Sequence, residues 1–277
     1  MTRPARPTRP RRISTSRPSS ADRPTSRAGA GGAAIRWHGT PPTHLGFEAL
    51  TAAGLPHATT TRHCPTTPAG GAPFSAEART AFAIDGAVPA VAFARQVHGA
   101  AAARATGGGS AGEADVLLTT TAGLPAAIVT ADCLPVVLYD PQVRALALAH
   151  VGWRGTVGGT ARAAVQALAA RGGAPARIVA AIGPSIGPCC YEVDQAVLDP
   201  LRAALGPVEP WITPRGDGRW LLDLWAVNEA ELARAGVDPG RIANARLCTA
   251  CRPDLFHSHR KGSPGRLVTL AMLPAAG

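Results

Sequence analysis

The stretch that decides the fold is AAIVTADCLPVVLYDPQVRALALAHVGW, residues 126–153. It contains three short apolar runs, at 126–130, 136–139 and 144–150, and Asp140-Pro141 supplies a turn before the last of them. Runs of this length, bounded by turn signals, are typical of strands buried within a sheet. Cys133 lies in the break between the first two runs and His150 ends the third. The stretch therefore predicts a buried sheet with a thiol and an imidazole at its strand ends.

Apolar runs on either side extend this pattern. They predict further strands at 91–97, which ends at His98, and at 178–182 and 267–273. Helical spacing predicts a helix over 160–171 and another that ends at Ala235, begun by an Asp223 cap and closed by Gly236. Strands and helices alternate irregularly and no internal repeat is evident. The pattern predicts one α+β domain.

Two segments interrupt the regular pattern. Apolar residues between 193 and 205 keep mostly helical spacing, but Pro200 is expected to break or kink that helix. Residues 101–114 contain Gly107-Gly108-Gly109 and are expected to form a flexible loop.

The positive charge is concentrated at the N-terminus. Residues 1–30 hold eight arginines and one aspartate, or +7 of the chain's net +10, so the remainder is close to neutral. This segment has almost no large apolar residues and is expected to be a disordered tail over 1–33, followed by a domain over 34–277. The tail is either a non-specific anchor for nucleic-acid phosphates or a plain solvated extension, and the second interpretation is favoured. No specific nucleic-acid partner is expected.

The sequence also indicates the cellular compartment of the protein. The sequence has no apolar stretch of membrane-spanning length, and no apolar run of signal-peptide length follows Arg11-Arg12. Six cysteines in 277 residues without an export signal favour thiol or metal chemistry in a reducing compartment over a disulfide framework. We expect a cytoplasmic protein without a membrane partner.

Three residues form a candidate metal site: His98, Cys133 and His150. Two imidazoles and one thiolate suit zinc, and three protein ligands leave the fourth coordination position open, as in catalytic zinc sites. The alternative is that the two histidines are buried structural residues and Cys133 is a core cysteine. Spacing alone does not separate these interpretations.

Four charged residues are candidates for the reaction itself. Asp132 adjoins Cys133 and could act as a general acid or base or orient a ligand, unless its side chain faces away along the strand. Arg62, Arg154 and Arg260 could bind phosphate, because a guanidinium matches an oxyanion bidentately; the alternative is surface or packing arginines. Together with Cys133, Asp132 and Arg62 are the candidate catalytic residues.

The remaining cysteines are harder to interpret. Cys248 and Cys251 form half of a possible metal site, and Cys189-Cys190 could supply the rest. Vicinal cysteines rarely ligate one ion together, so free thiols near the site are favoured. His257 and His259 are expected at the rim rather than among the ligands, although copper binding stays open.

Six ordered motifs carry a family resemblance: QVHG at 96–99, ADCLPVVL at 131–138, AHVGWRG at 149–155, GPSIGPCCYEV at 183–193, CTAC at 248–251 and SHRKGSPGR at 258–266. Over about 57–273 the chain resembles the laccase-domain family, also described as multicopper polyphenol oxidase-like or peptidoglycan editing factor proteins and as bacterial purine nucleoside phosphorylases. The resemblance implies two central mixed β-sheets flanked by helices. It also implies that His98, Cys133 and His150 are the zinc ligands.

The resemblance further implies phosphorolysis of adenosine, inosine, guanosine and methylthioadenosine to base and sugar 1-phosphate, with deamination of adenosine. The substrate rim differs from the family pattern. His63-Cys64 replaces a glycine-containing pair after Thr60-Thr61-Arg62, only 73–79 stands where two further motifs are usual, and His257 and His259 stand at aromatic positions of the last motif.

Three alternatives to a zinc-dependent phosphorylase remain. A copper polyphenol oxidase is weakened because one site of two histidines and a cysteine cannot assemble a trinuclear cluster, and the chain has eight histidines in all. A hydrolase that edits peptidoglycan precursors would use Cys133 as its nucleophile. A non-enzymatic binding protein is the third.

Overall fold

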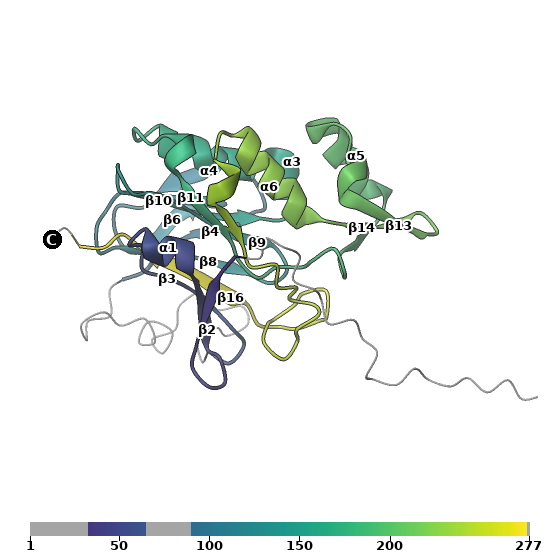
Figure 1. Ribbon diagram of the computed structural model, residues 1–277, viewed down its shortest axis with the longest axis horizontal. Coiled ribbons are helices and arrows are strands. Elements are labelled where there is room, and N and C mark those ends of the chain that lie inside the picture. Colours follow the sequence, from purple (N-terminus) through teal and green to yellow (C-terminus); the bar gives the residue numbers. More distant parts are fainter. Residues whose placement is uncertain (1–32, 65–89, 276–277) are drawn as a thin grey trace, which may run out of the picture. The chain divides into compact units, whose positions relative to one another are not determined.

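The computed structural model describes residues 33–64 and 90–275. In that part of the chain the strands form two large mixed sheets and a small third sheet (Figure 1). The seven-stranded sheet has the order β1 (Ile35–His38), β2 (His44–Phe47), β3 (His57–Thr60), β16 (Leu267–Met272), β8 (Pro125–Thr130), β4 (Ala92–Arg95) and β6 (Gly109–Glu113). The six-stranded sheet has the order β15 (Ile242–Asn244), β11 (Val179–Ile182), β9 (Leu134–Asp140), β10 (Ala145–Val151), β7 (Val116–Thr119) and β5 (Ala102–Arg104). The small sheet consists of β12 (Glu192–Val193), β14 (Arg219–Leu222) and β13 (Ile212–Gly216).

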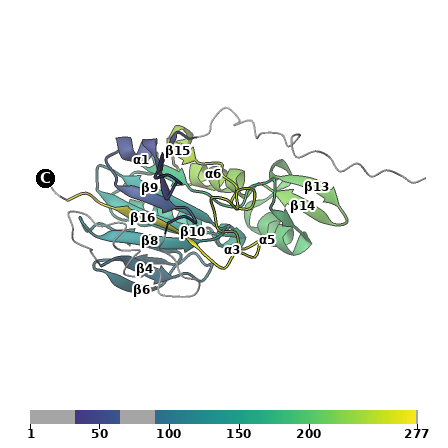
Figure 2. The same ribbon diagram turned by 90° about the horizontal axis from the view of Figure 1, so that it is seen from below.

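Helices cover the six-stranded sheet on one face, as Figure 1 shows for α3, α4 and α6. The described α-helices are α1 (Glu48–Ala52), α3 (Trp153–Gly158), α4 (Thr160–Ala169), α5 (Gln195–Leu205) and α6 (Leu224–Arg234). Short 3₁₀ turns occupy Pro175–Arg177, Glu209–Trp211 and Pro239–Arg241. In both views (Figures 1 and 2) α5 and the β13–β14 hairpin lie together at one end of the large sheets.

The middle strands are buried because both of their faces are covered. In β9, Val136 and Leu138 belong to the cluster that packs against the helices, whereas Val137 and Tyr139 pack toward the seven-stranded sheet. Successive side chains of a strand point to opposite faces, so one apolar run serves two cores. This explains why 134–140 and 145–151 are buried at every position.

The predicted fold class is confirmed: one α+β domain is built on two large mixed sheets with flanking helices. The strands expected at 126–130, 136–139 and 144–150 appear as β8, β9 and β10. The Asp223 carboxylate caps α6 by accepting from the Ala226 amide at 3.0 Å.

Two local predictions were wrong. Residues 101–114 are not simply a loop: they contain β5, paired with β7, and β6, paired with β4. Ladder hydrogen bonds come from the backbone, so a glycine-rich segment can still pair at a sheet edge. The break expected at Pro200 does not occur: α5 continues through this residue, and Leu198 and Leu201 are buried on either side of it.

The tail predicted over 1–33 lies almost wholly outside the described residues, as does most of the altered segment after Cys64. Within 33–64 and 90–275, none of the helices combines the length and apolar character needed to cross a bilayer.

Candidate metal centre

Three chain segments bring His98, Cys133 and His150 together. Antiparallel pairing of β10 with β9 places His150 opposite Pro135, two residues beyond Cys133 in the turn between β8 and β9. His98 comes from the turn after β4. The ligand atoms of the three residues all lie within 4.8 Å of one another. The two imidazoles meet edge to face, with ring centroids 4.7 Å apart.

Asp115, at the start of β7, organises two of these three residues. Its buried carboxylate accepts the consecutive backbone N–H groups of Val97, His98 and Gly99 at 3.1, 3.0 and 2.7 Å. His98 has a φ of 61°, a left-handed conformation that costs a non-glycine residue energy. Three charge-assisted hydrogen bonds to one carboxylate hold the turn in this shape.

The same carboxylate fixes the tautomer of His150. The Nδ1 atom of His150 lies 2.7 Å from Asp115 Oδ1. A buried carboxylate that takes four donors is an acceptor, so Nδ1 carries a proton and Nε2 is directed to the Cys133 side, where it presents a lone pair once the ring is neutral. A carboxylate behind a histidine in this way is a common support of protein metal sites.

In the metal-free site, Cys133 and His150 form a thiolate–imidazolium pair. Burial would raise the pKa of Cys133, but hydrogen bonds from His150 and His98 outweigh it and lower the pKa from 9.0 to about 7. Burial would lower the pKa of His150, but hydrogen bonds to Asp115 and Cys133 raise it from 6.5 to about 9. The thiolate is thus available near neutral pH, and His150 releases a proton when a cation replaces it beside the sulfur.

The Cys133 thiolate gives a testable pH profile. In the metal-free protein, alkylation of Cys133 by iodoacetamide, followed by peptide mass spectrometry, should rise with pH through a midpoint of about 7, because the thiolate is the reacting form. His150→Ala removes the main hydrogen bond to the sulfur and should move the midpoint upward. A wild-type midpoint at the ordinary value of about 8.5 would contradict the assigned pair.

Gly152 leaves the room that the sulfur needs. A Cβ at this position would lie 2.9 Å from Cys133 Sγ and 3.4 Å from His98 Cδ2. Gly152→Ala is therefore expected to displace both ligands and weaken zinc binding by about 10–100-fold, as loss of a supporting residue does. Competition with a chromophoric chelator measures this loss. Gly158→Ala is the matched control, since its Cβ would meet only Ala100 at 3.7 Å; equal affinities in the two variants would refute the steric argument.

A cavity of about 400 Å³ opens beside the three residues. Its lining residues are His98, Ala131, Asp132, Cys133, Gly152, Trp153, Arg154, Ile186, Tyr191, Leu224, His259 and Arg260. A volume of this size suits a small-molecule ligand. Burial raises the pKa of Tyr191, so its hydroxyl stays protonated and can donate a hydrogen bond.

The three candidate arginines fall in different places. Arg154 and Arg260 line the cavity. The guanidinium of Arg154 lies 4.4 Å from the ring centroid of Trp153, and that of Arg260 lies 5.3 Å from the ring centroid of Tyr191. Arg62 is not brought to this cavity; its guanidinium donates to the backbone carbonyl of Pro253.

Asp132 does not face away from the site. It lines the cavity and has a φ of 81°. Its Oδ1 accepts from the Thr249 hydroxyl at 2.6 Å and its Oδ2 accepts from the Arg260 backbone N–H at 2.7 Å. These contacts tie the loop after β15 to the turn that carries Cys133.

The other histidines and cysteines are not part of the three-residue ligand group. His259 lines the cavity, whereas His257 Nδ1 lies 2.7 Å from Ser263 Oγ. Cys189, Cys190, Cys248 and Cys251 form a second group whose sulfurs lie within 4.8 Å of one another, and none of them is in a disulfide.

Sequence reasoning missed Asp115 and Tyr191. Asp115 directly precedes the apolar run 116–118, and a lone carboxylate at the start of a buried strand is a usable signal. Tyr191 lies within the GPSIGPCCYEV motif, but no local sequence signal indicates that it faces the cavity.

The residues present fit a zinc ion. One thiolate and two imidazoles, with one imidazole backed by a buried carboxylate, are a common donor set for catalytic zinc, and the adjoining cavity leaves access to an open position. Copper also accepts these donors. A trinuclear copper cluster needs further histidines, and the described residues contain no other histidine group of this kind.

Comparison with protein families gives a match over residues 75–274 to the family described as multi-copper polyphenol oxidoreductase laccase. The purine nucleoside phosphorylase YlmD of Geobacillus stearothermophilus is 43% identical over 159 residues, which are 56% of this chain and 58% of that protein. A purine nucleoside phosphorylase of Deinococcus radiodurans is 40% identical over 200 residues, 71% of this chain and 76% of that protein.

Another relative is the adenosine deaminase RL5 of an unknown prokaryotic organism, 37% identical over 148 residues, or 53% of this chain and 56% of that protein. The matches thus span somewhat more than half the length of YlmD and RL5. The crystal structure of YlmD from Geobacillus stearothermophilus superposes with a TM-score of 0.77 at 32% identity, covering 86% of this chain and 99% of that one.

Proposed function

The chain belongs to the multi-copper polyphenol oxidoreductase laccase family, and on that basis we propose that it is a zinc-dependent enzyme that cleaves purine nucleosides with inorganic phosphate. The observation that carries the proposal is the convergence of His98, Cys133 and His150 beside a cavity whose lining includes His98 and Cys133 together with guanidinium and aromatic groups. Substrates are adenosine, inosine, guanosine and methylthioadenosine, in a cytoplasmic setting.

Each part of the cavity has a role in this proposal. Trp153 and Tyr191 offer aromatic faces to a purine ring. Arg154 and Arg260 bind phosphate through charge-assisted hydrogen bonds. Asp132 holds the loop of Arg260 against the Cys133 turn, so the phosphate site and the metal ligands keep a fixed separation. When bound, zinc supplies a Lewis acid and lowers the pKa of its water to roughly 7.

Deamination of adenosine is the accompanying activity, supported by the relative named adenosine deaminase. The two reactions can be distinguished because phosphorolysis needs phosphate as its second substrate, whereas deamination uses water. With phosphate, adenosine should give adenine and ribose 1-phosphate; without phosphate, only inosine and ammonia should form. Product chromatography in both buffers tests this, and the absence of both sets of products would overturn the proposed function.

One observation favours a second candidate function, that of a cysteine hydrolase. A thiolate paired with an imidazolium is also the arrangement of a cysteine nucleophile, as in a hydrolase acting on peptidoglycan precursors. Zinc on Cys133 would block this chemistry. A covalent substrate adduct on Cys133 in the metal-free protein, with activity lost on adding zinc, would favour the hydrolase.

The phosphate role of Arg154 gives another prediction. Arg154→Gln should raise the KM for phosphate about 10-fold or more, since a hydrogen bond to a charged group contributes about 1.5–3 kcal/mol. The KM for the nucleoside should change less. Arg62→Gln is the comparison, because Arg62 is engaged with Pro253 outside the cavity. A larger effect on phosphate KM in the Arg62 variant would reverse the assignment.

A further inference from the structure

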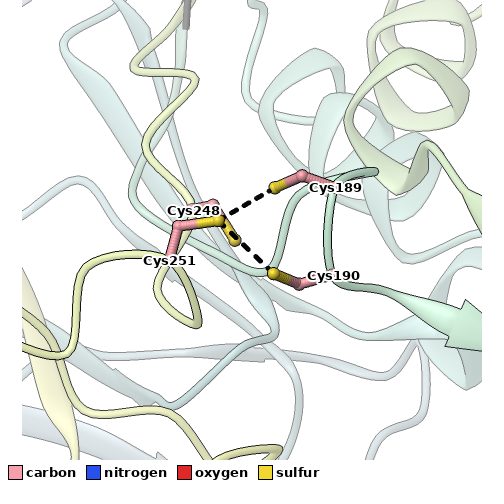
Figure 3. A group of neighbouring side chains, drawn as sticks. All are labelled: Cys189, Cys190, Cys248 and Cys251. Carbon is pink, nitrogen blue, oxygen red and sulfur yellow. Dashed lines mark hydrogen bonds between the residues drawn. The ribbon is translucent and has the colours of Figure 1, made fainter. Parts of the chain in front are cut away.

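Two turns bring four cysteines to one point. Strands β11 and β15 are parallel neighbours, so the turns after them leave the same edge of the sheet. The turn after β11 carries Cys189 and Cys190, and the turn after β15 carries Cys248 and Cys251. Figure 3 shows the two pairs facing each other, with the sulfur atoms directed into the space between them.

The sulfur positions match a single tetrahedral ion. Cys251 Sγ lies 3.2 Å from Cys189 Sγ and 3.3 Å from Cys190 Sγ, and all four sulfurs lie within 4.8 Å of one another. With zinc–sulfur bonds of about 2.3 Å, a tetrahedron of thiolates has edges of about 3.8 Å, inside this range. An iron–sulfur cluster places several atoms between its cysteines and would need them farther apart.

The contacts of Cys248 and its spacing from Cys251 also suit a metal site. Cys248 is buried, and its sulfur accepts the Gly187 backbone N–H at 3.3 Å. Hydrogen bonds of this kind stabilise metal-bound thiolates. Cys248 and Cys251 have the two-residue spacing found in structural zinc sites.

Both turns are rigid enough to hold the vicinal pair in place. Trp225 Nε1 donates to Ser185 Oγ at 2.7 Å, and the Trp225 ring fills the space that a Cβ on Gly187 would occupy. The Thr249 backbone N–H donates to the Ser185 carbonyl at 3.1 Å, which joins one turn to the other. Vicinal cysteines rarely bind one ion together, but here the positions of the sulfurs allow both Cys189 and Cys190 to do so.

We propose that Cys189, Cys190, Cys248 and Cys251 bind a second zinc ion, which is structural and has no open position. It would crosslink the turn after β11, which lines the cavity through Ile186 and Tyr191, to the turn after β15. Each turn contacts Asp132: Ile186 donates its backbone N–H to the Asp132 carbonyl at 2.9 Å, and Thr249 donates to the carboxylate. The inference does not depend on the reaction proposed above.

The test uses the full chain with the first site removed. His98→Ala/His150→Ala, purified under reducing conditions, should retain about one zinc per chain by elemental analysis, whereas the wild type should hold about two. Replacement by cobalt(II) in this variant should give strong sulfur-to-cobalt charge-transfer absorption and the visible bands of a tetrahedral tetrathiolate. Cys248→Ser/Cys251→Ser should lose one zinc, and Cys64→Ser, the matched control, should lose none.

The possible results distinguish failure of the second zinc site from failure of the proposed function. A double-histidine variant that holds no metal, or iron or copper in place of zinc, would overturn the inference even if the Cys248/Cys251 variant did not fold. A disulfide from Cys251 to Cys189 or Cys190 in the reduced preparation, found by peptide mapping, would also overturn it. If the variant keeps one zinc while the wild type lacks nucleoside turnover, the second site stands and the proposed function fails.

Discussion

His150→Ala is expected to abolish zinc binding at the three-residue site and to reduce phosphorolysis by more than about 100-fold. Loss of a residue behind a ligand costs about 10–100-fold in affinity or activity, and loss of the ligand itself should exceed this. The His150 side chain is buried at the end of β10 and supplies one of three donors, so only two protein ligands would remain. Zinc competition and product chromatography measure the two losses.

The fold should survive this substitution, because β10 keeps its backbone pairing with β9 and β7. His44→Ala, in a strand of the other large sheet and outside the ligand group, is the matched control and should keep both zinc and activity. Full phosphorolysis by the His150 variant would show that the metal mechanism is wrong.

Asp115→Asn is expected to lower zinc affinity and kcat/KM by about 10–100-fold without removing a ligand. An amide has one acceptor oxygen, so its NH₂ group must face N–H groups of the 97–99 turn or the Nδ1–H of His150. Asp115→Ala should in addition cost about 3–5 kcal/mol of unfolding free energy, the usual loss when one partner of a buried pair is removed. Zinc competition and denaturant unfolding of the metal-free protein provide the measurements.

Asp140→Asn is the matched control for Asp115. Asp140 is also buried in the six-stranded sheet, and it accepts from Gln142, Ala174 and Arg177 away from the candidate ligands. Its substitution should reduce stability and leave zinc affinity unchanged. If Asp115→Asn behaved like this control, the orienting role of Asp115 would be refuted.

The sequence predicted the parts of this protein that depend on local pattern. Buried strands on either side of Cys133 and up to His150 follow from apolar runs and turn residues, because strands covered on both faces carry few polar side chains. The edge strands at 102–104 and 109–113 have no such pattern. Their pairing is set by backbone hydrogen bonds and by the neighbouring strand, which a local sequence signal does not contain.

The residues of the candidate site also divide into those that the sequence predicts and those that only the fold reveals. His98, Cys133 and His150 were found as residue types that bind soft or borderline metals. Asp115 was missed because its role depends on the register of β10 against β7, where the His150 backbone N–H bonds the Asp115 carbonyl at 2.8 Å. The sequence predicts a phosphate-binding role for both Arg62 and Arg260, but the fold brings only Arg260 to the cavity. Only the tertiary structure distinguishes these two arginines.

The most direct test of the central claim is the zinc dependence of phosphorolysis in one preparation. The full chain is stripped with a chelator, and adenosine turnover in phosphate is measured before stripping, after stripping and after reloading with zinc. Adenine and ribose 1-phosphate should vanish on stripping and return on reloading, with no return in His150→Ala. Undiminished turnover by the stripped protein would contradict the account.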